Sequence, residues 1–205
     1  MGKSLGETIA QLRALSAIRQ ALALLGSQLP AYLQYHSYQH TEDVLQEVIK
    51  LALIDSLPER DTELLAVAAA WHDVGFIYAN SANEPLAAQE MCNSLSALGQ
   101  YSDSEIATIA QMILDTALVV DGATLKQHAT IPLSRYLLDA DLANFGRDDF
   151  FEKSELRRKE SGEPVELFRS KTFLLVQNHT WLTKAAHTLW QEKKEQNLQA
   201  LTKAL

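Results

Sequence analysis

The segment AAWHDVGFIY, residues 69–78, places a histidine and an aspartate at the end of a strongly apolar stretch of the chain. Leu65 and Ala68 lie seven and four residues before His72, which is the spacing of one buried face of a helix. The imidazole of His72 is therefore expected to face the core, and the carboxylate of Asp73 follows it directly. A buried polar ring needs a partner. That partner is either an ordinary acceptor in the core or a bound ligand, and the rest of the sequence is needed to choose.

The composition limits the kinds of protein that this chain can be. It has 205 residues, 47% of them apolar, which is enough for one sizeable core and hence one domain. A net charge of −8 without a basic cluster argues against a nucleic acid polymer or an anionic membrane as partner. The single cysteine, Cys92, excludes an intrachain disulfide and a thiolate metal cluster. No apolar run is long enough to span a bilayer and the start does not resemble a signal peptide, so we expect a cytoplasmic protein.

Apolar residues recur with helical period along almost the whole chain, which predicts an all-α fold. The only β-like stretch is LVV, residues 118–120, ahead of a turn at Asp121 and Gly122. Ser102 and Glu105 form a predicted capping box at one helix start. Prolines mark three other starts: Pro85, Pro132 and Pro164. The predicted helices span residues 5–27, 38–55, 61–75, 84–98, 103–118, 132–145, 148–161, 164–177 and 181–203.

A second histidine-bearing segment lies upstream, in YLQYHSYQHTEDVLQEV, residues 32–48. His40 continues into Val44 and Leu45 at helical spacing, so it too is expected to face the core. His36 lies in the turn before that helix.

A third segment, SRYLLDADLANFGRDDFF at residues 134–151, contains two aspartates. At about 100° per residue, Asp141 shares a side with Leu137 and Leu138, whereas Asp139 points roughly 160° away. Asp141 is therefore the inward carboxylate. Three predicted helices thus each place a His or Asp toward the core. An isolated buried carboxylate costs free energy. Two imidazoles and two carboxylates that share one divalent cation avoid this cost, so the pattern favours a metal site.

The order His40, His72 with Asp73, and Asp141 resembles the HD superfamily of metal-dependent phosphohydrolases. The resemblance extends to YHSYQHTEDVL, AAWHDVGF, Glu84, YSDSEIATIAQMILDT and LLDADLANFGRDDF, and it covers about residues 30–200. The chain is most similar to small stand-alone bacterial HD proteins. This implies a single HD-type helical bundle over residues 1–205. Its expected parts are an N-terminal helix at 5–27, an HD core at about 30–146 and C-terminal helices at about 148–203.

The resemblance implies that one divalent ion is bound by four residues: His40, His72, Asp73 and Asp141. Such imidazole and carboxylate ligands suit manganese, iron, nickel, cobalt or zinc, and magnesium at the more oxygen-rich end. The downstream histidine pair typical of two-metal HD sites is not evident, so we expect one tightly bound ion. The chain also lacks the GYP signature of the cyclic diguanylate phosphodiesterases, and Phe76 stands where many HD proteins have Lys.

Four further residues are candidates with an ordinary alternative each. His36 resembles the histidine that protonates the leaving oxygen in cyclic nucleotide phosphodiesterases, or else it is an exposed turn residue. Glu84 orients the attacking water or binds a second ion, or else it is a first-turn carboxylate stabilised by the helix dipole. Arg147 and Arg157 contact a substrate phosphate, or else they pair with local acids. Three histidines have no partner that the sequence identifies and are interpreted as structural: His128, His179 and His187.

The leading functional hypothesis is a metal-dependent phosphohydrolase that cleaves a phosphoester, in a nucleotide or another small phosphorylated metabolite, with metal-activated water. Asp73 is its orienting carboxylate and His36 its candidate acid. The alternative is a non-catalytic HD-fold module for nucleotide binding or regulation, and a third hypothesis is another metal-assisted hydration or oxidation on the same scaffold. The partner expected in each case is a small molecule, and the sequence also allows a homodimer.

Overall fold

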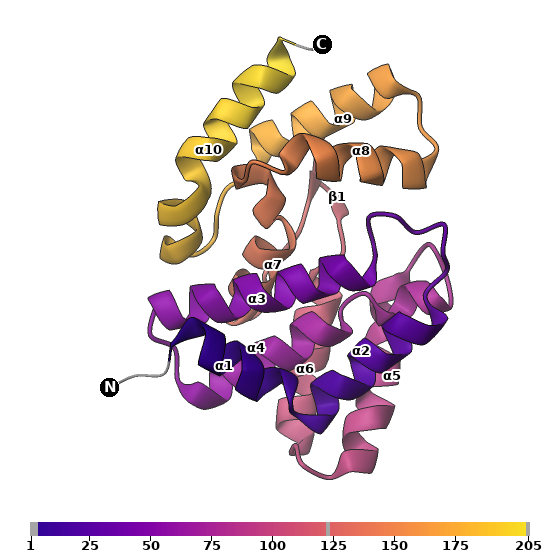
Figure 1. Cartoon of the computed structure of the whole chain (residues 1–205), viewed down its shortest axis with the longest axis vertical. Helices are drawn as coiled ribbons and strands as arrows, with labels where there is room; N and C mark the ends of the chain where they lie inside the picture. Colours follow the sequence, from indigo (N-terminus) through magenta and orange to yellow (C-terminus); the bar gives the residue numbers. More distant parts are fainter. Residues whose placement is uncertain (1–3, 122–123, 204–205) are drawn as a thin grey trace.

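The computed structural model describes residues 4–121 and 124–203. Within these residues the chain is built from helices and one short hairpin, so the all-α prediction is confirmed (Figure 1). The α-helices are α1 (Leu5–Arg13), α2 (Ser16–Gln28), α3 (Tyr38–Ile54), α4 (Glu59–Trp71), α5 (Asn83–Leu98), α6 (Asp103–Asp115), α7 (Ser134–Asp141), α8 (Phe150–Ser161), α9 (Val165–Asn178) and α10 (Lys184–Thr202). The shorter elements are two 3₁₀ helices, η1 (Val74–Ile77) and η2 (Ala143–Gly146), and two strands, β1 (Val119–Asp121) and β2 (Thr124–Lys126).

The first predicted helix, over residues 5–27, is wrong in one respect, because the structure divides it into α1 and α2. Leu15 takes an extended backbone conformation between them. The break lets α1 pack on α3 while α2 packs on α4. The indole N–H of Trp71, at the end of α4, donates to the carbonyl of Ala17 at 3.0 Å and holds α2 in place. Tertiary packing has therefore overridden a continuous helical periodicity.

Two other predicted helices end earlier than expected, each directly at candidate site residues. The helix predicted at 61–75 ends at Trp71 and is followed by η1, and the helix predicted at 132–145 ends at Asp141 and is followed by η2. Glycine permits close backbone packing in both 3₁₀ helices. A Cβ on Gly75 would lie 1.9 Å from the carbonyl oxygen of Asn83, and one on Gly146 would lie 2.3 Å from Cβ of Trp190. No residue other than glycine fits either position without backbone movement.

The β-like stretch at residues 118–120 has a partner that the sequence did not predict. Strand β1 pairs antiparallel with β2, with Val119 opposite Lys126. The predicted turn begins at Asp121, and its Gly122 lies outside the described residues. The hairpin leads directly into Gln127, whose side chain reaches the candidate site.

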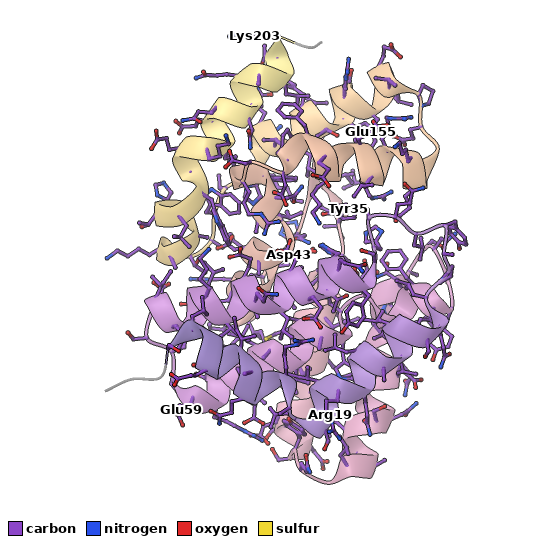
Figure 2. All side chains as sticks on the ribbon, viewed as in Figure 1. Arg19, Tyr35, Asp43, Glu59, Glu155 and Lys203 are labelled. Carbon is purple, nitrogen blue, oxygen red and sulfur yellow. The ribbon has the colours of Figure 1, made fainter. Side chains whose placement is uncertain are left out.

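The helices form two groups. Helices α3, α4, α6 and α7 pack on one another and contain much of the core, whose largest fully buried side chain is Trp71. Helices α8 and α9 lie across from α3, and α10 runs beside η2 and α9 (Figure 1). Side chains extend into the space between α3 and α8, where Tyr35 and Asp43 are labelled (Figure 2).

Asp139 turns away from Asp141 and is fully buried on the opposite side of α7. Its carboxylate accepts hydrogen bonds from the backbone N–H of Leu182 at 2.9 Å and from the backbone N–H and hydroxyl of Thr183 at 2.8 and 2.7 Å. Burial raises the pKa of Asp139 to about 6 despite these bonds. The carboxylate therefore anchors the start of α10 and is a structural group.

His179, which the sequence left without a partner, is packed edge-on between the rings of Phe145 and Trp181. The ammonium of Lys194 donates to the backbone carbonyl of His179 and lies 3.4 Å from its Nδ1. Burial and the charge of Lys194 lower the pKa of His179 from its ordinary value of 6.5 to about 3. The folded protein therefore holds this imidazole neutral.

This depressed pKa predicts a loss of stability in mild acid. As pH falls below 6.5, His179 binds a proton in the unfolded chain but not in the folded chain. The free energy of unfolding therefore falls by about 1.4 kcal/mol per pH unit until the pH reaches the folded pKa. Between pH 6.5 and 5, His179→Gln should remove about 2 kcal/mol from the pH dependence of the unfolding free energy, measured with urea. His187→Gln, at an exposed site on α10, is the control and should keep the wild-type slope. Equal slopes in all three proteins would contradict the assignment.

Candidate metal centre

The two core-facing histidines come from opposite ends of their helices. His40 lies in the first turn of α3, where its backbone N–H donates to the hydroxyl of the capping residue Ser37 at 3.3 Å. His72 directly follows the last residue of α4, and Asp73 lies between α4 and η1. All three residues are buried, and for His40 and His72 the sequence predicted this from the spacing of the apolar residues around them.

Four side chains converge on one point. Nε2 of His40 lies 3.2 Å from Oδ1 of Asp141 and 3.6 Å from Oδ2 of Asp73. Nε2 of His72 lies 3.3 Å from Oδ2 of Asp73 and 3.7 Å from Oδ1 of Asp141. The structure therefore brings together all four residues that the sequence proposed as ligands. One nitrogen or carboxylate oxygen from each of His40, His72 and Asp73 could bind a metal ion, and these atoms all lie within 4.8 Å of one another.

The protonation pattern of His72 tests whether these residues fit a metal ion. Nδ1 of His72 lies 2.7 Å from the carbonyl oxygen of Ala69. Because a carbonyl oxygen only accepts, Nδ1 carries the hydrogen and Nε2 presents a lone pair in the neutral ring. Both Nε2 of His72 and Oδ2 of Asp73 are buried without a hydrogen-bond partner among the described residues. Two facing acceptors without a donor fit a divalent cation, and a backbone carbonyl on the other nitrogen is the usual support for a histidine ligand.

In the metal-free protein a proton takes the place of the cation. Burial alone would lower the pKa of His72, but the carboxylates of Asp73 and Asp141 outweigh it and raise the pKa to about 9. Burial would raise the pKa of Asp73 and of Asp141, and the nearby imidazoles instead hold both below their usual range. A metal ion bound through Nε2 of His72 would therefore displace a proton, as is general for histidine ligands.

The second oxygen of Asp141 is held by a residue that the sequence reasoning missed. The amide Nε2 of Gln127 donates to Oδ2 of Asp141 at 2.7 Å and to the backbone carbonyl of Thr116 at 2.8 Å. Gln127 comes directly after β2 and has no helical spacing to reveal it.

His36 is neither fully exposed nor free in its turn. Its side chain is 15% exposed, and its ring stacks on Phe76 with the ring centres 4.1 Å apart. Glu160 of α8 contacts Nδ1 of His36 and accepts from the backbone N–H groups of Tyr35 and His36 at 2.9 and 3.0 Å. The half-buried Tyr35 ring in turn lies against His40, with centroids 4.8 Å apart. Glu160 and Tyr35 were both missed by the sequence reasoning.

A cavity of about 530 Å³ opens beside the four converging side chains. Its walls include His36, from the turn before α3, and Glu84, in the first turn of α5. This position of Glu84 fits both interpretations of the residue. Helix α8 contributes a polar stripe with helical spacing: Lys153, Arg157, Glu160 and Ser161. Apolar side chains cover another part of the wall: Leu118, Leu142, Phe168 and Leu175.

The two candidate phosphate-binding arginines are in different surroundings. Arg157 lines the cavity and is 43% exposed, with its guanidinium 3.8 Å from Glu160. Arg147 lies outside that cavity lining and pairs with Asp43 at 2.6 Å, Asp149 at 2.6 Å and Glu47 at 3.3 Å. For Arg147 the structure therefore supports the alternative of pairing with local acids. Lys153 is a cavity cation that the sequence reasoning missed, although its spacing of four residues from Arg157 was a usable signal.

Comparison with known proteins supports the fold. No protein-family model matches the chain, and no curated protein matches it. The crystal structure of Bacillus subtilis YpgQ in complex with ADP resembles it with a TM-score of 0.63 and 14% sequence identity, over 91% of this chain and 95% of that chain. At this identity the likeness concerns the fold, and an all-α bundle with the observed convergence of His and Asp is compatible with an HD-type domain. In the described part of the chain, no helix is long and apolar enough to cross a membrane.

Paired aspartate variants on α7 separate the metal centre from the structural carboxylate. We expect Asp141→Ala to lose bound divalent metal, because one carboxylate leaves the point where four side chains converge. Asp139→Ala should retain the metal but lower the melting temperature, because the start of α10 loses its acceptor. Elemental analysis and thermal melts of the purified proteins measure both effects.

Chelation gives the matching control in the unmodified protein. Since metal bound only to the folded state stabilises it, a chelator should lower the melting temperature of the wild type and leave that of Asp141→Ala almost unchanged. Equal metal loss from both aspartate variants would show that the site has been placed on the wrong face of α7.

Proposed function

We propose that this chain is an HD-type, metal-dependent phosphohydrolase that cleaves a phosphoester in a nucleotide or another small phosphorylated metabolite. The observation that carries the proposal is the convergence of two imidazoles and two carboxylates at the wall of a cavity large enough for a metabolite. His40, His72 and Asp73 are buried, and Nε2 of His72 and Oδ2 of Asp73 have no hydrogen-bond partner among the described residues. The ADP bound to the similarly folded YpgQ supports a nucleotide as the ligand class.

The metal would be held by His40, His72, Asp73 and Asp141, whose mixed donor set suits manganese, iron, nickel, cobalt, zinc or magnesium. When bound, such an ion lowers the pKa of water and takes up charge on phosphoryl oxygens. Asp73 adds a carboxylate that can accept a hydrogen bond from the attacking water and so orient it. Glu84, which also lines the cavity, is the second carboxylate proposed to orient water.

His36 is the proposed general acid. Its contact with Glu160 through Nδ1 fixes the ring and leaves Nε2 as the nitrogen that gives a proton to the leaving oxygen. The Phe76 ring on one face of the imidazole limits its rotation. These contacts supply the orientation that a general acid needs, and they favour this role over that of an unconstrained turn histidine.

The substrate anion is proposed to bind the two cations of the polar stripe of α8. Arg157 and Lys153 lie one helical turn apart and both line the cavity. Because the whole chain has a net charge of −8, two cations that line the same cavity create a local positive region that attracts a phosphate anion. Arg147 is left out of this proposal because three carboxylates already engage its guanidinium.

A substrate screen tests the proposed function. Purified protein should hydrolyse at least one member of a panel of phosphomonoesters, phosphodiesters and nucleotides when supplied with Mn²⁺, Fe²⁺, Ni²⁺, Co²⁺, Zn²⁺ or Mg²⁺. Asp73→Asn should abolish that turnover, while Lys159→Met, at an exposed position of α8 outside the cavity lining, should not. Tight nucleotide binding without turnover would instead support the non-catalytic binding module.

The acid role of His36 predicts a dependence on the leaving group. His36→Ala should keep its metal and lose about a hundredfold or more in turnover on an alkyl or ribose phosphoester. The loss should be much smaller on a nitrophenyl ester, whose leaving oxygen hardly needs a proton. The same loss on both substrates, or loss of metal from the variant, would rule out the acid role.

A further inference from the structure

We infer that Gln127 is a positioning residue for the metal centre and fixes Asp141 so that only one of its carboxylate oxygens is offered to the ion. The inference rests on the proposed metal centre and adds to it a residue on the β-hairpin side of the molecule, which supplies none of the proposed ligands. The observation behind it is the pair of hydrogen bonds that joins Gln127 to Thr116 and to Asp141 beside the cavity.

The orientation of the Gln127 amide is determined by its two partners. Nε2 lies 2.7 Å from Oδ2 of Asp141 and 2.8 Å from the carbonyl oxygen of Thr116. Both partners accept hydrogen bonds and the amino group has two hydrogens, so each hydrogen has its own acceptor. The flipped amide would place its oxygen against two oxygens. The amide is therefore held as a donor toward Asp141.

This hydrogen bond gives the two oxygens of the Asp141 carboxylate different roles. Oδ1 faces Nε2 of His40 at 3.2 Å and Nε2 of His72 at 3.7 Å, whereas Oδ2 is bound by Gln127. Without the amide, the carboxylate can rotate and exchange its oxygens. Hydrogen bonds of this kind to metal-binding carboxylates typically contribute a factor of about 10–100 to metal affinity.

The chain around Gln127 is anchored so that the amide is already in place before a metal binds. Thr116, which accepts the second hydrogen bond, directly follows the last residue of α6. Three residues after Gln127, the backbone N–H of Thr130 donates to Asp115 at 2.8 Å, and its hydroxyl contacts the same carboxylate. The segment from the hairpin to α7 is therefore attached to the end of α6 at two points.

Oε1 of Gln127 is buried and has no hydrogen-bond partner among the described residues. An unpaired buried acceptor costs free energy, so a packing role alone would favour an apolar side chain of the same shape. A requirement for the amino group explains why an amide stands here.

A pair of glutamine variants tests this inference. Gln127→Met keeps the length of the side chain and removes the donor. Gln191→Met is the matched control, because Nε2 of Gln191 donates to Oε1 of Glu195 at 2.7 Å, a bond of the same length to a carboxylate on α10 that is neither a proposed ligand nor part of the cavity lining. Affinities for Mn²⁺ and Zn²⁺ alone are measured by calorimetry on metal-free protein, together with melting temperatures of the same samples.

We expect Gln127→Met to bind metal about 10–100-fold more weakly than the wild type and Gln191→Met to bind it normally. The metal-free melting temperatures of the two variants should fall by similar small amounts, which separates positioning from general destabilisation. Unchanged metal affinity in Gln127→Met, or equal weakening in both variants, would overturn the inference while leaving the metal centre intact. A wild type that binds no divalent ion would overturn both this inference and the proposed function.

Discussion

The hydrogen bond between Nδ1 of His72 and the carbonyl of Ala69 sets the chemistry of the candidate site. The last turn of a helix leaves its carbonyl groups without intrahelical donors, and α4 ends at Trp71, so the carbonyl of Ala69 is free to accept from the next side chain. The end of α4 thereby determines which ring nitrogen of His72 carries the hydrogen. In the neutral ring, Nε2 therefore presents its lone pair toward the point where the carboxylates of Asp73 and Asp141 converge.

The parts of the site that helical periodicity could identify are the parts that lie on helices. The inward faces at His40, His72 and Asp141 follow from their spacing to apolar neighbours, and the structure brings these residues together. Periodicity could not reveal Gln127, which follows a strand, or the division of the first predicted helix, which depends on packing against α4. Glu160 lies on a helix, but its role in the site comes from its hydrogen bonds to the backbone of residues 35–36. The local sequence around Glu160 does not reveal a contact with so distant a segment.

Arg147 illustrates why a cation near a site is not by itself a binding group. Burial would lower the pKa of its guanidinium, but the carboxylates of Asp43 and Asp149 outweigh this and raise it. The resulting ion pairs join α3, which contains His40, to the segment that leads into α8. The charge of Arg147 is thus used to hold α3 to the start of α8, and α8 presents its own cations, Lys153 and Arg157, to the cavity.

The close approach at Gly75 has a consequence for how the cavity can change. Because a Cβ at this position would lie only 1.9 Å from the carbonyl oxygen of Asn83, η1 and the first turn of α5 are in backbone contact. Asp73 and Glu84 therefore belong to one rigid wall whose spacing no side-chain substitution can adjust. The opposite wall is made by side chains of α8 and α9, such as Phe168 and Leu175. Substitutions in α8 and α9 can therefore change the size of the cavity without moving the backbone, whereas the spacing of Asp73 and Glu84 is fixed by the contact at Gly75.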